Sequence, residues 1–204
     1  MNSFDDFLTG LELLDWQPVG HIDPGVLELL AELGRTPQML WDVIRSWDTA
    51  SLETRQLRCH ETTTHYKWFV HYHETLRYRI WLHQYKPAIE RRNGYAEVPH
   101  NHRYSLASLI LSGQFKQHFF DVVAGELAET LGECTAYSPG DVYSIDWCRV
   151  HKLSGLSDHT VTLVVESPVV RHFSEAFYGA AGQPNLCPDF VALHPHLLDE
   201  VACL

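Results

Sequence analysis

Histidine is the residue type best able to do chemistry in this sequence, which has 14 histidines among 204 residues. Histidine is the commonest metal ligand in proteins and titrates near neutral pH. Three pairs have the form His-x-His, and they are His71/His73, His100/His102 and His194/His196. Residues i and i+2 of a strand point to the same side, so two such imidazoles can reach one metal ion. Solvated or hydrogen-bonded histidines give the same pattern, and the surroundings must distinguish the three pairs.

The middle pair lies in a longer pattern. Gly113 follows His102 by 11 residues, and His151 follows Gly140 of the run Pro139-Gly140-Asp141 by 11 residues. This order and spacing resemble the two sequence motifs of the cupin superfamily, over roughly residues 60 to 170. The resemblance implies a double-stranded β-helix jelly roll. It also implies one metal ion bound by His100, His102 and His151.

The departures from the cupin pattern narrow the resemblance. Leu106 and Ala107 stand where a cupin carries its glutamate ligand, so three neutral histidines remain. In this the chain is similar to the thiol dioxygenases, typified by cysteine dioxygenase, which hold mononuclear iron with three histidines. Glu166 stands just before Ser167-Pro168, where that group carries a tyrosine. The cysteine that crosslinks to this tyrosine would align near Ala107. That crosslink cannot form here, which speaks against cysteine itself as the substrate.

The resemblance therefore implies an Fe2+-dependent oxygenase of the cupin type. Three neutral ligands leave a divalent ion with two positive charges and open positions, which favours an anionic, chelating substrate together with O2. We expect a small metabolite bearing a carboxylate or a thiol. Imidazole also suits other divalent transition metals. A metal-dependent lyase or isomerase, with the metal as Lewis acid, is an alternative, as is a non-catalytic metabolite-binding cupin.

Four further residues are expected to contribute to the site. Tyr104 lies two residues after His102, so in a strand it points to the same side as the histidine pair. It is expected to act as an acid or to orient O2, unless it is a packed aromatic residue. His118 would be a fourth ligand or a base, or else a core or edge histidine. Arg79 and His83 share the polar face of a regular strand, where Arg79 could clamp a carboxylate in a bidentate manner, unless that face is solvated.

Two carboxylates complete the expected site. Asp146 and Glu166 are expected to accept hydrogen bonds from the ligand imidazoles, because metal-bound histidines usually need such a partner.

The elements that must position these residues can be read from periodicity. Apolar residues recur at helical spacing in the first 55 residues. Alternating patterns and turn residues then indicate strands at 66–72, 76–83, 104–111, 115–123, 134–137, 142–145 and 160–166. We therefore predict a mainly β protein, with a helical segment over 1–55, a cupin barrel over 56–170 and a C-terminal extension over 171–204 that packs on the barrel.

Composition restricts the partners. The net charge of −11 makes the chain a poor candidate for binding nucleic acid or an anionic membrane surface. No apolar run approaches a membrane span, and the acidic N-terminus lacks the features of a signal peptide. Five scattered cysteines without a Cys-x-x-Cys pair indicate reduced thiols. We expect a cytoplasmic protein whose partners are a small-molecule substrate and O2, and the sequence allows a homodimer.

Overall fold

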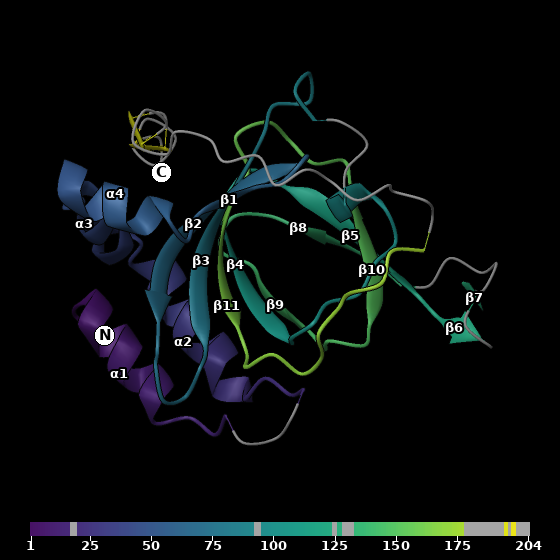
Figure 1. Cartoon of the computed structure of the whole chain (residues 1–204), viewed down its shortest axis with the longest axis horizontal. Coiled ribbons are helices and arrows are strands. Elements are labelled where there is room, and N and C mark those ends of the chain that lie inside the picture. The colour runs from purple at the N-terminus through teal and green to yellow at the C-terminus, as the bar shows by residue number, and fades with distance from the viewer. Residues whose placement is uncertain are drawn as a thin grey trace.

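The computed structural model describes residues 1–16, 20–91, 95–123, 126–127, 133–177, 194–195 and 197–198. Two layers of antiparallel strands enclose a barrel interior, and the N-terminal helices gather against the outside of one layer (Figure 1). The helices are α1 (Phe4–Glu12), α2 (Pro24–Arg35), α3 (Gln38–Arg45) and α4 (Thr49–Gln56), with a 3-10 turn at Tyr95–Glu97. None of the helices in this part of the chain has the length and apolar content of a membrane span.

The larger sheet has six strands in the order β1-β2-β3-β11-β4-β9. Their bounds are β1 (His60–Glu61), β2 (His65–Tyr72), β3 (Arg79–Tyr85), β11 (Val161–Glu166), β4 (Leu106–Ser112) and β9 (Val142–Ile145). The strand β11 thus lies between β3 and β4, pairing Glu166 with Arg79 on one side and with Leu106 on the other.

The smaller sheet has the order β10-β5-β8, with β10 (Val150–Ser154), β5 (Phe115–Phe120) and β8 (Cys134–Tyr137). The short strands β6 (Val122–Val123) and β7 (Glu126–Leu127) form a separate pair. After β4 the chain crosses to the smaller sheet for β5 and β8, returns to the larger sheet for β9, crosses again for β10 and returns for β11. A bridge between His100 and His151 extends the smaller sheet. This is a jelly-roll topology, and it confirms the predicted mainly β fold with a helical N-terminus.

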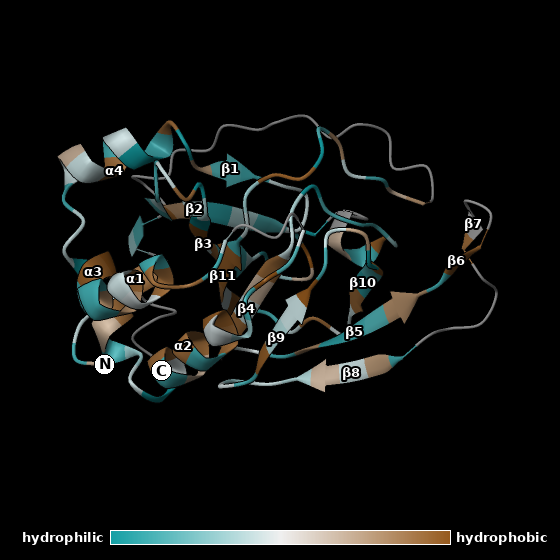
Figure 2. Cartoon of the chain, turned by 90° about the horizontal axis from the view of Figure 1, so that it is seen from below, coloured by the Kyte–Doolittle hydropathy of each residue, from teal (hydrophilic) through white to brown (hydrophobic). Residues whose placement is uncertain are grey.

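Strand alternation gives the larger sheet two different faces. The outer face is apolar and forms one buried cluster with residues of the helices, including Ile80, Leu82, Leu109, Leu30 and Leu33. Figure 2 shows the helices lying along this side of the strands. The inner face carries the polar alternates, such as His83 and Arg79, as the alternation in the sequence predicts.

Two elements differ from the sequence-based expectation. Helix α4 falls at the end of the predicted helical segment, but it is not predicted as a separate helix. The strand β10, which carries His151, is not predicted at all. The run from Val150 to Ser154 is short, and Lys152 interrupts its apolar pattern. The strand forms because it pairs with β5 along its whole length.

Gly113 makes the tight turn between β4 and β5, with a φ of 72°. A Cβ atom there would lie 2.7 Å from Thr160 Cα, a backbone atom that cannot rotate away. We expect Gly113→Ala to lower the free energy of unfolding by about 3 kcal/mol, from left-handed strain plus the clash. Gly140→Ala is the matched control, because Gly140 has a φ of 90° and open space around it. It should lose only about 1–2 kcal/mol in urea denaturation, and equal losses for the two variants would contradict the prediction.

Candidate metal centre

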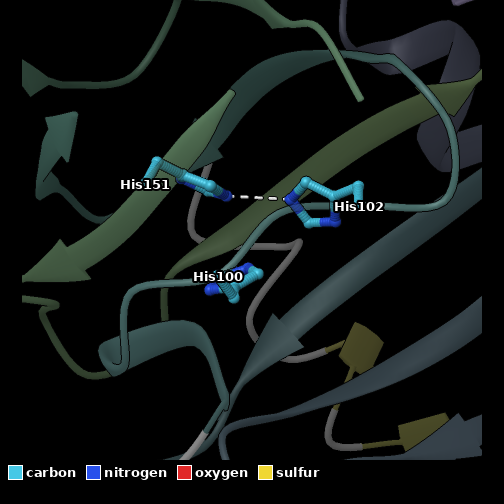
Figure 3. Close-up of side chains that lie close together, drawn as sticks. All are labelled: His100, His102 and His151. Carbon is cyan, nitrogen blue, oxygen red and sulfur yellow. Dashed lines mark hydrogen bonds between the residues drawn. The ribbon is translucent and has the colours of Figure 1, made fainter. Parts of the chain in front are cut away.

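Three histidines that are distant in sequence meet at one point of the barrel. Each of His100, His102 and His151 offers a ligand nitrogen, and these nitrogens lie within 4.8 Å of one another. His102 Nε2 and His151 Nε2 are 2.8 Å apart (Figure 3). His100 and His151 are buried, and His102 is partly buried. This is the metal-ligating set that the sequence motifs predicted.

Backbone pairing brings the ligands together. The amide of His100 donates to the carbonyl of His151, the amide of His151 donates back to His100, and both distances are 2.9 Å. The amide of His102 donates to the carbonyl of Trp147 at 3.1 Å. The His-x-His segment therefore acts as a short strand beside β10, and its spacing of two places both imidazoles on the inner side.

Residues that follow β11 form hydrogen bonds with the His-x-His segment. Arg171 Nε donates to the carbonyl of His102 at 3.1 Å. Asn101 Nδ2 donates to Glu175 Oε2 at 2.7 Å, and the Glu175 amide donates to Asn101 Oδ1 at 2.7 Å. Asn101, whose side chain points the opposite way from the two histidines, thus fixes the backbone that carries them.

The protonation states suit metal binding. His100 Nδ1 lies 2.8 Å from the carbonyl oxygen of Val98, which can only accept, so Nδ1 carries the hydrogen and Nε2 keeps a lone pair. Burial lowers the pKa of His100 to about 4. Burial and the neighbouring histidines hold the pKa values of His102 and His151 well below the ordinary value. All three imidazoles are therefore neutral at neutral pH, as metal ligands must be.

The geometry and the donor set fit a transition metal. Nitrogens that bind one ion at 2.0–2.1 Å and at right angles lie about 3 Å apart, close to the 2.8 Å between His102 and His151. Three imidazoles suit zinc, copper, iron or nickel, whereas magnesium and calcium prefer oxygen ligands. The cluster is thus a site for a divalent transition metal.

The strand order and the meeting of both motif segments at one site are those expected from the sequence motifs. The fold is the jelly roll that the resemblance to the cupins implies. No family model matches the chain, and no curated protein matches it.

Solved structures similar to this chain exist, at low sequence identity. "The structure of KdgF from Halomonas sp." has 17% identity and a TM-score of 0.39, and the match covers 53% of this chain and 86% of that one. Oxalate decarboxylase from Bacillus subtilis has 13% identity and a TM-score of 0.41, and the match covers 58% of this chain but only 29% of that one. "DMSP lyase DddQ from Ruegeria pomeroyi DSS-3" has 13% identity and a TM-score of 0.36, and the match covers 52% of this chain and 45% of that one. Similarity at this level says nothing about activity.

The three histidines open on a cavity of about 190 Å³ inside the barrel. Leu106, Ile145 and Val164 form an apolar part of its wall. Among the described residues that line it, Lys67 carries the permanent charge, and no carboxylate lines it. The other polar residues that line it are Thr62, His65, Lys67, His83, Tyr85, Tyr104 and Tyr143.

Two of the expected site residues line this cavity. The Tyr104 ring stacks on that of His102, with 5.7 Å between centroids, and its hydroxyl lies 3.5 Å from Lys67 Nζ. Burial and nearby Glu166 raise the pKa of Tyr104 well above its ordinary value, so its hydroxyl stays protonated. His83 is also in the cavity, and its buried Nε2 has no hydrogen-bond partner among the described residues.

Arg79 is on the expected face but not in the cavity. Its Nε forms an ion pair with Glu166 Oε2 at 3.1 Å, and its side chain lines a neighbouring pocket. Glu166 is 1% exposed and also pairs with Lys67 Nζ at 3.0 Å. The expectation that Glu166 accepts from a ligand imidazole is therefore corrected, since both its oxygens face cations. These cations lower the Glu166 pKa, although burial, the largest influence, raises it.

The structure does not bring His118 or Asp146 to the cluster. In the pairing of β5 with β10, Phe119 lies opposite His151, so the neighbouring His118 points to the other face. His118 Nε2 lies 2.6 Å from Ser154 Oγ, and the expectation of a fourth ligand or a base is corrected accordingly. Asp146 is exposed, and its nearest ionic partner is His21 at 4.0 Å.

Lys67 and His65 are cavity residues that the sequence analysis missed. In β2, His65, Lys67 and Phe69 are two residues apart and therefore point to the same side of the strand. This spacing is the signal that could have placed His65 and Lys67 on the inner face. His65 Nδ1 contacts the hydroxyls of Thr62 and Thr64 at 3.1 and 2.9 Å, which leaves Nε2 toward the interior.

Proposed function

We propose that this protein is an O2-dependent oxygenase of the cupin type, with mononuclear Fe2+ on His100, His102 and His151, that acts on a small metabolite bearing a carboxylate or a thiol. The observation that supports the proposal is the set of three neutral imidazoles without a carboxylate ligand, facing a small cavity. Such a set leaves the charge of a divalent ion uncompensated, which favours an anionic substrate. Bound Fe2+ would supply open coordination positions and the redox chemistry that O2 requires.

The chain's own residues would bind and orient the substrate. The Lys67 ammonium group, next to the cavity, attracts a carboxylate, although its pairing with Glu166 at 3.0 Å reduces that attraction. The protonated Tyr104 hydroxyl lies 3.5 Å from Lys67 Nζ and is hydrogen-bonded to Glu166, and it would have to leave Glu166 to donate to a substrate oxygen. The apolar wall of Leu106, Ile145 and Val164 excludes water and strengthens these polar contacts.

A lyase or isomerase is the second candidate. Tyr104, Lys67 and His83 supply proton donors and acceptors within one cavity, as a reaction driven by proton transfer needs. The metal would then act as a Lewis acid.

Assays with and without O2 distinguish these functions. We expect iron-loaded protein to consume O2 together with one member of a panel of small carboxylates and thiols, and to show no turnover without O2. Tyr104→Phe should lower kcat/KM by about 100-fold if it acts as an acid in the reaction. The control Tyr137→Phe removes a hydroxyl from β8, outside the cavity lining, and should have little effect. Anaerobic turnover would instead establish the lyase or isomerase, and binding without turnover in either atmosphere would establish a non-catalytic protein.

A further inference from the structure

A second pocket, of about 450 Å³, lies beside the metal cavity and contains three arginines from two parts of the chain. Arg58 follows α4, Arg77 lies in the turn between β2 and β3, and Arg79 begins β3. Guanidinium groups stay protonated at any physiological pH and bind carboxylates and phosphates through paired N–H groups. Their convergence on one concave surface therefore indicates a site for an anion.

Arg79 forms the inner end of this pocket. Its Nε is paired with Glu166, but its Nη2 is buried and has no hydrogen-bond partner among the described residues. A buried donor without a partner is unfavourable, and an acceptor brought into the pocket would relieve that cost. The side chain as a whole is 22% exposed and lines the pocket, so a ligand there can contact it.

Arg58 and Arg77 form the outer part of the pocket. In the described part of the chain, no carboxylate forms an ion pair with either of them. The Arg58 guanidinium group lies over the ring of Phe69, 4.9 Å from its centroid. Arg77 has a φ of 63°, a left-handed conformation that costs energy in any residue with a Cβ. Glycine would relieve this strain, and arginine nevertheless occupies the position.

The charge around the pocket is opposite to that of the whole chain. The chain has a net charge of −11, yet none of the described residues lining the pocket is acidic. Glu166 lies behind the pocket and is shared by Arg79 and Lys67, so it does not compensate Arg58 or Arg77. Phe69, Tyr72 and Trp81 also line the pocket and supply aromatic surface beside the cations.

The pocket is separate from the metal cavity. Trp81 lines the pocket while Lys67 lines the cavity, and Lys67 Nζ lies 4.9 Å from the Trp81 ring centroid. Arg79 and Tyr104 face each other in the same way, with the guanidinium carbon 5.3 Å from the ring centroid. These two contacts form a wall between the two spaces.

We propose that this pocket binds a small organic anion that carries at least two negative charges and a planar apolar group. Aryl phosphates and aromatic dicarboxylates share this chemistry. The three arginines bind the charged end, and the aromatic side chains contact the planar group. Binding requires neither the metal nor the three histidines.

Calorimetric titration of phenyl phosphate and of phthalate, with phenol as the neutral probe, tests this proposal. Metal-free wild-type protein and His102→Ala are both used, so that neither probe can bind at a metal. We expect at least one dianion to bind both proteins, with phenol showing no binding, and the better of the two dianions identifies the charged group as phosphate or dicarboxylate.

Variants then locate the binding. Arg58→Ala and Arg77→Gly should each weaken binding at least about tenfold, because each removes a charge-assisted contact. Glycine accepts the left-handed conformation at position 77, so Arg77→Gly should not lower the melting temperature. The control Arg45→Ala removes an exposed arginine in α3, outside the pocket lining, and should leave affinity unchanged. Absence of binding by both dianions, or affinities that Arg58→Ala and Arg77→Gly do not alter, would overturn the proposal.

Discussion

Replacement of His151 by alanine is expected to abolish stoichiometric retention of a divalent transition metal. Protein purified without chelator should carry about one equivalent, and the variant should bind at least about 100-fold more weakly, because loss of even an outer-shell partner costs 10–100-fold. Elemental analysis and titration with Co2+ measure both quantities. His102→Ala should behave in the same way, since its Nε2 lies 2.8 Å from that of His151.

The matched control is His118→Ala. His118 lies on β5, the strand paired with β10, but it points to the opposite face from the cluster. Its removal should leave metal content unchanged. Full metal occupancy in His151→Ala, or loss of metal in His118→Ala, would show that the metal is bound elsewhere.

The metal-free protein is expected to lose stability steeply on acidification from pH 7.5 to pH 5. Burial lowers the pKa values of His65, His83, His100 and His151 in the folded state, that of His100 to about 4. Below pH 6.5 the unfolded chain therefore binds more protons than the folded one, and the free energy of unfolding falls as pH falls. Each such histidine contributes up to about 1.4 kcal/mol per pH unit.

Urea denaturation at several pH values measures this loss. The window runs from pH 6.5 down to the folded-state pKa values. Glu166 adds a loss in the same direction below about pH 4.5, because its folded-state pKa is also lowered. His83→Gln removes one of the titrating groups and should flatten the slope. An unchanged free energy of unfolding between pH 7.5 and pH 5 would contradict the prediction.

The sequence predicts those features that depend on local periodicity and on spacing. The strands at 134–137 and 142–145 are confirmed at the predicted bounds, and the inner face of β3 follows from its alternation. Two of the metal ligands could be predicted because they lie at strand spacing, and the resemblance to the cupin motifs implied the third, 11 residues after Gly140. Periodicity and spacing use residues that are close together along the chain, whereas the link between the two motif segments came from the resemblance.

The rest of the site depends on register between distant strands. Alternation gives the face on which Arg79 lies, but its ion pair with Glu166 arises from the pairing of β3 with β11, whose register no local pattern sets. His118 shows the same limit, since its direction relative to His151 is set by the pairing of β5 with β10. Lys67 was missed because lysine is ordinarily solvent-exposed, and its partial burial depends on Glu166, 99 residues later.

The place of β11 in the larger sheet has a consequence for how the protein is synthesised. It is the last strand in the part of the chain that the structure describes, yet it lies between β3 and β4. On the ribosome, 81 residues must follow Tyr85 before Glu166 is added, which takes about 4–16 s at ordinary rates of translation. During that interval one edge of β3 and one edge of β4 lack their neighbour, and exposed strand edges promote aggregation. The nascent chain is therefore most in need of a chaperone while this central strand is still being made.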